Sequence, residues 1–188
     1  MRYSKFMKRK SILLNCAVTV FLLASPVSGE TDEMEALFEG LKGADPAAAA
    51  QIETRIYDLW SKSGSPSMDM LLERGRKALE EGDATLAILH FSALIDHAPF
   101  FAEGYNGRAT AYFQAGKYGL SLEDIRRTLE LNPRHFGAMS GLALILEEIG
   151  EPEAALEAWR EVERFYPARE GLAEAMRRLE RLVEGERI

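Results

Sequence analysis

Four markers recur at intervals of 34 residues between Met68 and Pro167, and this period constrains the fold more than any other feature of the chain. In each unit a small residue precedes a glycine, a second small residue is followed four positions later by a bulky one, and a proline closes the unit. Such a period is typical of stacked helix–turn–helix units, which form an extended binding surface rather than a catalytic pocket. In chain order the markers are Gly75, Gly82, Ala87, Phe91 and Pro99; Ala109, Gly116, Ser121, Ile125 and Pro133; and Ala143, Gly150, Ala155, Trp159 and Pro167.

The register of these markers resembles the tetratricopeptide repeat (TPR) pattern, W-x2-L-G-x2-Y followed by A-x3-F and a proline. Its first element reads Leu71-x2-Arg74-Gly75-x2-Ala78, Tyr105-x2-Arg108-Ala109-x2-Tyr112 and Met139-x2-Leu142-Ala143-x2-Leu146. Arg74 and Arg108 stand where the family usually has an apolar residue. The resemblance covers roughly the middle half of the chain and implies an all-α, right-handed α-solenoid of three TPR helix pairs, over residues 68–101, 102–135 and 136–169.

Small residues in both helices of each predicted pair allow the two backbones to approach closely. The bulky residue one turn further along fills the space beneath them. We therefore expect the following residues to pack the repeats together: Gly75, Ala87, Phe91, Ala109, Ser121, Ile125, Ala143, Ala155 and Trp159.

Further residues predict where the helices begin and end. We expect the second glycine of each unit to end the first helix in the left-handed conformation, which glycine adopts at little cost. Ser67 and Asp83 are suited to cap the helices that follow them, and Pro152 is suited to a first helical turn. The proline of each unit stops the second helix.

The first 29 residues have the layout of a secretory signal peptide. A basic stretch ends at Lys10, Ile12–Ala24 is apolar apart from Asn15 and Thr19, and small residues follow. We predict cleavage after Gly29. The main alternative is an uncleaved anchor, but the apolar run is shorter than the roughly 20 residues that a spanning helix needs.

Cys16 raises the further alternative of a lipoprotein. Asn15 precedes this cysteine and most of the apolar run follows it, which is a poor fit to a lipidation site. Cleavage after Gly29 would remove the only cysteine of the chain. We therefore expect no disulfide or thiol chemistry in the mature protein, despite its export.

Cleavage would also make an acidic chain more acidic. The sequence carries 23 basic and 30 acidic residues, a net charge of −7. Loss of the five basic residues of the signal would leave 18 basic residues and a net charge near −12. This charge disfavours nucleic acid and anionic membrane surfaces, and it favours a solvated monomer that does not insert into a membrane and is open to basic partners.

Residues 30–66 are expected to form an N-terminal helical extension. The pattern predicts one helix over Glu33–Lys42 and another over Pro46–Lys62. The extension could be a degenerate fourth repeat, but Leu41 and Glu53 fall where such a repeat needs small residues. We therefore favour a distinct N-terminal cap.

Residues 170–188 are expected to form a C-terminal capping helix, which begins at about Arg169 and ends at about Glu184. A repeat array needs a last helix with one apolar face toward the final pair and one polar face toward water. The apolar stripe consists of Leu172, Met176, Leu179, Leu182 and Val183, and the arginines that lie off it are Arg177, Arg178 and Arg181.

The sequence contains little that points to catalysis or to a metal. Its three histidines, His90, His97 and His135, form no zinc motif. We expect His97 near a helix end and His135 in a turn, both as structural or surface residues. No phosphate-binding loop or nucleophile–base pattern is present. We therefore predict that the protein is not an enzyme and uses no cofactor.

In TPR arrays the first helices of successive pairs line a concave face, so the resemblance implies a binding groove for an extended peptide or a partner helix. Its polar members are the strongest candidates, because polar residues gain nothing from burial in a core. The apolar members one turn from core positions, Leu79, Phe113 and Leu144, could equally be core residues. The predicted groove consists of Leu72, Arg76, Asn106, Thr110, Phe113, Ser140 and Leu144, with Leu79 and Glu147 on the same face.

Cytosolic TPR proteins that hold chaperone tails bind a terminal carboxylate with a clamp of lysines, asparagines and an arginine. No lysine stands at the corresponding groove positions of this chain. The resemblance therefore does not imply a chaperone-tail role, and export argues in the same direction.

Glycines interrupt the predicted first helices of the second and third repeats, at Gly104, Gly107, Gly137 and Gly141. A glycine inside a helix costs up to about 1 kcal/mol relative to alanine. Gly107 and Gly141 share one repeat position beside the groove. Close approach of a ligand backbone would explain them, and so would tight helix packing, which we weigh slightly higher.

The sequence predicts an exported TPR adaptor or scaffold, most simply periplasmic and otherwise extracellular, that holds a protein or peptide partner in its concave groove. In a first alternative, the protein acts through its N-terminal helices or its convex face, with the groove empty or filled by its own N-terminal helix. In a second, it is a non-catalytic accessory subunit of an envelope enzyme or assembly machine.

Overall fold

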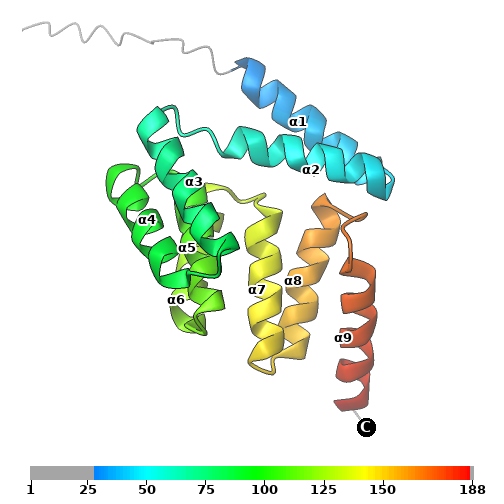
Figure 1. Cartoon of the computed structure of the whole chain (residues 1–188). Helices are drawn as coiled ribbons and strands as arrows, with labels where there is room; N and C mark the ends of the chain where they lie inside the picture. Colours follow the sequence, from blue (N-terminus) through cyan, green and yellow to red (C-terminus); the bar gives the residue numbers. More distant parts are fainter. Residues whose placement is uncertain (1–27, 187–188) are drawn as a thin grey trace, which may run out of the picture.

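The computed structural model describes residues 28–186, and this part of the chain contains helices and no strands (Figure 1). Most of the predicted signal peptide, residues 1–27, lies outside the described residues. The helices are α1 (Ser28–Gly43), α2 (Pro46–Trp60), α3 (Pro66–Glu80), α4 (Ala84–His97), α5 (Ala102–Gln114), α6 (Tyr118–Leu131), α7 (Phe136–Glu148), α8 (Pro152–Phe165) and α9 (Leu172–Glu186).

The helices from α3 onward pack in sequence order. α3 packs on α4, α5 on α6 and α7 on α8, and each such pair contacts the next. Figure 1 shows these helices side by side, joined by short turns. The predicted all-α solenoid is therefore confirmed.

The turns between paired helices follow the prediction. Gly82, Gly116 and Gly150 have positive φ angles of 77°, 69° and 80°. Residues other than glycine rarely adopt this backbone conformation. The Asp83 carboxylate then accepts a hydrogen bond from the Leu86 backbone N–H at 2.9 Å. This bond satisfies one of the free N–H groups at the start of α4.

The start of α3 differs from the prediction. The helix begins at Pro66, with Ser65 at the cap position and no side-chain cap bond, so Ser67 lies inside the helix and is not its cap. Asp69 fixes this turn instead, because its Oδ1 accepts hydrogen bonds from the N–H of Ser63 at 2.9 Å and from its hydroxyl at 2.6 Å.

Small residues bring the paired helices together. The Gly75 Cα lies so close to Phe91 that a Cβ added there would be 2.5 Å from the ring. In the next pair the Ser121 hydroxyl donates a hydrogen bond to the Ala109 carbonyl at 2.7 Å. All nine residues assigned to repeat packing are buried: Gly75, Ala87, Phe91, Ala109, Ser121, Ile125, Ala143, Ala155 and Trp159.

An ion pair explains why an arginine stands at one apolar position of the repeat pattern. Arg108 on α5 donates two hydrogen bonds to the buried Asp124 carboxylate on α6, at 2.7 and 2.8 Å, and a third to Ser92 on α4 at 3.2 Å. The bond to Asp124 raises the pKa of Arg108. A bidentate arginine–carboxylate pair of this kind is among the strong side-chain interactions. Together with the bond to Ser92, it joins α4, α5 and α6.

The N-terminal extension folds back onto the far end of the solenoid. α1 contacts α8, and Figure 1 shows α1 and α2 lying across the ends of α7 and α8. Phe38 and Ile56 share one buried core with Phe136 and Trp159. The extension therefore packs its apolar residues against the last helix pair, while Ser61 and Ser63 near its end hydrogen-bond to α3. A fourth repeat or a simple cap at the N-terminal end would instead pack against the first pair.

The C-terminal helix covers α8, as expected of a capping helix. It begins at Leu172, three residues later than predicted, after a turn at Gly171 with φ of 76°. Leu172, Leu179 and Val183 are buried, whereas Leu182 remains half exposed. Within residues 28–186, no helix is both long and apolar enough to cross a membrane.

Candidate functional site

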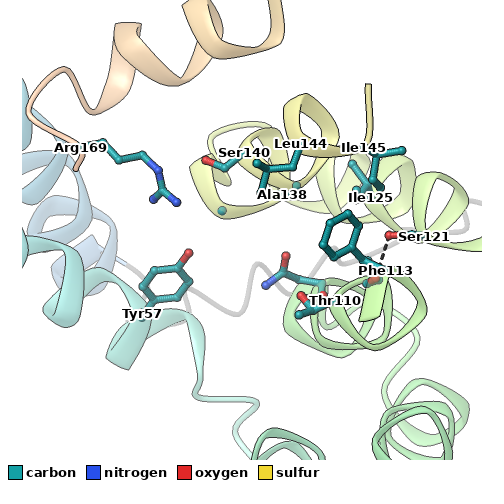
Figure 2. A pocket seen from close by; sticks show the side chains of 14 residues that line it. Tyr57, Thr110, Phe113, Ser121, Ile125, Ala138, Ser140, Leu144, Ile145 and Arg169 are labelled. Carbon is teal, nitrogen blue, oxygen red and sulfur yellow. Dashed lines mark hydrogen bonds between the residues drawn. The ribbon is translucent and has the colours of Figure 1, made fainter. Parts of the chain in front are cut away.

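A half-open cavity of about 230 Å³ lies between α5 and α7 (Figure 2). Two residues of α6 form part of its wall, and single residues from α2 and from the α8–α9 connection complete it. The lining residues are Tyr57, Asn106, Ala109, Thr110, Phe113, Ser121, Ile125, Gly137, Ala138, Ser140, Gly141, Leu144, Ile145 and Arg169.

Five of the seven residues predicted for the groove line this cavity: Asn106, Thr110, Phe113, Ser140 and Leu144. Two pairs among them, Asn106 with Ser140 and Thr110 with Leu144, are one repeat period apart, so equivalent positions of α5 and α7 face one space. Leu144 is 43% exposed. An apolar side chain that lines a cavity and remains this exposed belongs to the groove rather than to the core.

Leu72 and Arg76 do not line the cavity. Burial corrects the predicted groove position of Leu72, whereas that of Arg76 stays a prediction. Leu72 is 2% exposed and belongs to the core between α3 and α4. Arg76 donates a hydrogen bond to the Ser61 hydroxyl at 2.8 Å and lies 3.7 Å from the Glu103 carboxylate. Its charge is therefore directed at the end of α2 and the start of α5.

Two further residues expected on the concave face have other roles. Leu79 packs against the core of the first helix pair, as the core alternative predicted. Glu147 accepts a hydrogen bond from the Trp159 indole N–H at 2.7 Å and pairs with Arg178 of α9. It therefore joins α7 to α8 and α9 outside the cavity.

Both hydroxyl donors along the middle of the cavity, and one N–H of the Asn106 amide, are already engaged. Thr110 donates to the Asn106 carbonyl at 3.1 Å, and Ser140 donates to the Phe136 carbonyl at 2.7 Å. The Asn106 side-chain N–H donates to Glu103 at 3.2 Å. The Thr110 hydroxyl oxygen and the Asn106 Oδ1 thus remain as acceptors for a ligand.

Tyr57 brings a hydroxyl from α2 to the cavity. Its ring packs edge-on against Trp60 and Phe136, with centroids 5.4 and 5.5 Å away. Gly137 makes this possible, because a Cβ there would clash with the hydroxyl. Burial, and next the charge of Glu103, raise the pKa of Tyr57 well above its ordinary value, so the hydroxyl stays neutral and can donate a hydrogen bond.

Arg169 brings a positive charge from the α8–α9 connection. Its Nη1 lies 3.5 Å from Glu53 on α2, and the Tyr166 hydroxyl donates to the same carboxylate at 3.1 Å. Burial and this carboxylate raise the pKa of Tyr166 to about 12. The guanidinium is therefore held from one side by a single long contact.

A buried polar cluster lies behind the cavity, at the N-terminal ends of α5 and α7. His135 is fully buried and accepts the Ala138 backbone N–H at its Nδ1, so the proton of its ring is on Nε2, 3.4 Å from Glu103 Oε1. Trp60 stacks on the imidazole with centroids 4.4 Å apart. The cluster thus joins the extension to the solenoid, and His135 is a structural residue at a helix start, as predicted.

Glu103 is the acidic centre of this cluster and is 2% exposed. Burial by itself would raise the pKa of Glu103, but His135, Arg76 and Asn106 together hold it below the ordinary 4.5. Its Oε1 and the His135 Nε2 have no hydrogen-bond partner among the described residues at ordinary distance.

The interior glycines divide between packing and the cavity wall. A Cβ at Gly107 would lie 2.5 Å from the Phe91 ring, so tight helix packing explains this residue. A Cβ at Gly141 would meet only Ile125 Cδ1, at 3.4 Å, and Gly141 lines the cavity. The two occupy one repeat position but have different neighbours.

Sequence reasoning missed Tyr57 and Arg169. The repeat period identifies the wall residues on α5 and α7, because equivalent positions face the same side. Neither Tyr57 nor Arg169 belongs to the first helix of a repeat, and no local pattern marks them.

Among residues 28–186, no group of three or more His, Cys, Asp or Glu side chains is arranged to hold a metal ion.

Comparison with known proteins agrees with this architecture. A sequence model of the tetratricopeptide repeat family matches residues 72–119 and 106–170, more than half of the chain. A TPR repeat-containing protein of Rhizobium etli is 35% identical over 161 residues, which make up 85% of this chain and 79% of that protein. Small glutamine-rich tetratricopeptide repeat-containing protein 2 of Saccharomyces cerevisiae is 28% identical over 114 residues, 61% of this chain and 33% of that protein.

Solved structures show the same fold. The first TPR of Spaghetti (RPAP3), bound to the HSP90 peptide SRMEEVD, superposes with a TM-score of 0.60 at 21% identity, over 62% of this chain and 93% of that one. The Sgt2 TPR domain of Aspergillus fumigatus gives 0.60 at 21% identity, over 65% and 83%. MamA gives 0.55 at 19% identity, over 78% of each chain. The periodic sequence, the helical array and these relatives together place the chain in the tetratricopeptide repeat family.

Proposed function

We propose that this protein is an exported adaptor that holds a short segment of a partner protein in the cavity between α5 and α7. The observation that supports this most directly is the cavity itself, half open and lined by equivalent positions of successive repeats. Apolar walls with a few placed polar groups are typical of ligand sites. Among solved structures with this fold, the RPAP3 repeat is bound to a peptide.

Export to the periplasm rests on the N-terminal sequence. The basic segment, the short apolar run and the small residues before Glu30 have the order of a secretory signal. Fractionation of cells that produce the full-length chain with a C-terminal tag tests this. Recovery of a shortened chain in the periplasmic or secreted fraction supports export, whereas a full-length chain in the cytosol contradicts it.

Affinity capture from the native host tests the groove. The bait is the tagged chain, compared with a Leu144→Glu variant that places a charge at the exposed mouth of the cavity. The matched control is Leu120→Glu, at a leucine of similar exposure on α6 that does not line the cavity. A partner lost with Leu144→Glu and retained with Leu120→Glu supports capture in the groove.

A partner that is retained with Leu144→Glu and lost with Leu120→Glu would instead favour the alternative of an accessory subunit that binds through another surface. A specific observation gives this alternative weight, since Leu86 and Leu89 are exposed on α4 beside a shallow hollow. If the partner still binds Leu144→Glu but no longer binds Leu89→Glu, the interface lies on the exposed surface of α4 and not in the cavity.

A further inference from the structure

The bulky position of the repeat carries an aromatic ring in the first and third helix pairs but not in the second. Phe91 on α4 and Trp159 on α8 occupy this position, and Ile125 occupies it on α6. All three side chains are buried. Ile125 belongs to the wall of the cavity between α5 and α7, so the cavity lies beside the pair that lacks the ring.

The first and third pairs show what a ring does at this position. A Cβ added at Gly75 of α3, or at Gly107 of α5, would lie 2.5 Å from the Phe91 ring. This ring therefore fills the space between α3 and α5 as far as the backbone. In the third pair the Trp159 indole N–H also finds an acceptor inside the protein, the Glu147 carboxylate at 2.7 Å.

The smaller Ile125 leaves room at the corresponding place between α5 and α7. A Cβ added at Gly141, the counterpart of Gly107, would meet only Ile125 Cδ1, at 3.4 Å. Ala109 stands where the first pair has Gly75, and it lines the cavity together with Ile125. Figure 2 shows Ile125 beside Phe113 and Ile145 in the wall of this opening. The glycine that would accommodate a ring thus borders a half-open cavity instead.

The size of the cavity fits one ring. An engineered cavity of about 150 Å³ with apolar walls binds benzene. The cavity between α5 and α7 has a volume of about 230 Å³, so it holds one ring of up to the size of indole and not two.

The charges around the cavity favour a neutral ligand. Arg169 lines the cavity but is paired with Glu53, at 3.5 Å. Burial, and next the charge of Glu103, raise the pKa of the Tyr57 hydroxyl, so a buried carboxylate acts on the same end. These two carboxylates offset the positive charge of Arg169, and a ligand gains little there from a negative charge of its own.

The polar groups of the wall suit a ring that carries a hydrogen-bond donor. The Thr110 hydroxyl oxygen and the Asn106 Oδ1 remain as acceptors, because the hydrogen bonds that these side chains make within the protein use their donors. An indole N–H or a phenol O–H can donate to either oxygen. Phe113 lies on the same wall, and a second ring can pack against it edge-on or in an offset stack.

We propose that the cavity takes the side chain of one tryptophan or tyrosine of the captured segment, in the place that Phe91 fills in the first helix pair. The proposal rests on the proposed function, because it names the kind of residue that anchors this segment. Aromatic side chains in buried pockets are among the residues that dominate binding at protein interfaces. The anchoring residue need not stand at either end of the partner chain.

Neutral single-residue ligands test the subsite in the intact protein. The probes are N-acetyl-tryptophanamide, N-acetyl-tyrosinamide and N-acetyl-leucinamide, which carry no charged terminus, and free indole. Binding is followed by NMR shifts of the backbone amides of Gly137, Ala138 and Gly141. The two aromatic amides should shift these resonances and bind at least about fivefold more tightly than the leucine amide.

Variants that fill the cavity assign the binding to this place. Ile125→Phe supplies the missing ring and should weaken binding of the tryptophan amide at least about tenfold. The matched control is Leu120→Phe, which adds a ring to the same helix at an exposed position outside the cavity and should have no effect. Circular dichroism and melting curves show that each variant is folded.

Gly141→Ala keeps the test decisive if Ile125→Phe does not fold. It adds one methyl group beside Ile125 without a clash, and alanine favours the helix. This variant should weaken binding of the tryptophan amide at least about twofold.

Equal binding of the tryptophan and leucine amides, no shift at the cavity with any probe, or unchanged binding by the folded cavity variants overturns the subsite. Free indole that binds more tightly than the tryptophan amide contradicts its assignment to a partner segment. Each of these results leaves the capture experiment with Leu144→Glu as an independent test of the adaptor function. Binding of the aromatic amides that is lost with Ile125→Phe supports the subsite even where capture recovers no partner.

Discussion

Gly107 and Gly141 show how two residues at one repeat position can have different roles. At Gly107 an added methyl group would enter the Phe91 ring, while at Gly141 it would only touch Ile125. The repeat register alone makes them equivalent. Their neighbours differ because Phe91 and Ile125, which occupy the same position in successive repeats, differ in shape.

Gly107→Ala should therefore destabilise the protein by about 1–3 kcal/mol, the usual cost of overpacking. Gly141→Ala should be neutral or stabilising by up to about 1 kcal/mol, because alanine is the better helix former. Urea unfolding of the two single variants measures both changes. Equal losses for the two variants would contradict this assignment.

Ionisation of Glu103 should make the free energy of unfolding depend on pH. Its pKa is lowered in the folded protein, so the carboxylate contributes stability above its unfolded pKa near 4.5, and this contribution is lost as the pH falls through the folded pKa. Glu103→Gln should cost about 1–3 kcal/mol at neutral pH, and the difference from the native protein should shrink when the pH is lowered from neutral to below 4.5.

Unfolding free energies at both pH values measure this difference. Glu148→Gln, at an exposed position of α7, controls for the loss of one negative charge. A difference for Glu103→Gln that remained constant between the two pH values would show that the carboxylate is not the titrating group.

At the scale of the element, residues at the cap position of a helix differ in whether the side chain makes a cap hydrogen bond. Asp83 makes a cap hydrogen bond at 2.9 Å, whereas Ser65 occupies a cap position without one. Asp83→Ala should cost about 1 kcal/mol. Ser65→Ala should change the free energy of unfolding by less than about 0.5 kcal/mol. Thermal melting of both variants measures the contrast, and a larger loss for Ser65→Ala would refute it.

At the scale of the whole molecule, the extension and the last helices form one cooperative unit. Phe38 is 2% exposed and shares the largest core cluster with residues of α7, α8 and α9, while Phe100 is 80% exposed. Arg134 before α7 donates to Glu35 of α1 at 2.7 Å and lies over the Phe38 ring. Simple stacked repeats contact only their neighbours, so this closure adds a long-range contact.

Phe38→Ala should destabilise the protein by about 3–5 kcal/mol and should increase hydrogen exchange in α7 and α8, far away in sequence. Phe100→Ala, the same change at the surface, should stay within about 0.5 kcal/mol. Hydrogen exchange with peptide resolution tests the coupling. Faster exchange confined to α1 and α2 would show that the extension is a separate unit.

The sequence by itself determined the helices, their turns and the inward positions of α5 and α7, because glycine, proline and helical spacing act within a few residues and repeat with a fixed period. Five groove residues, such as Thr110 and Leu144, followed from that period. Only the tertiary structure decided that the extension returns to α7 and α8, and that Tyr57 and Arg169 meet at one cavity. Their positions depend on burial of Phe38 and Ile56 against residues about a hundred positions away, and no local pattern records such a contact.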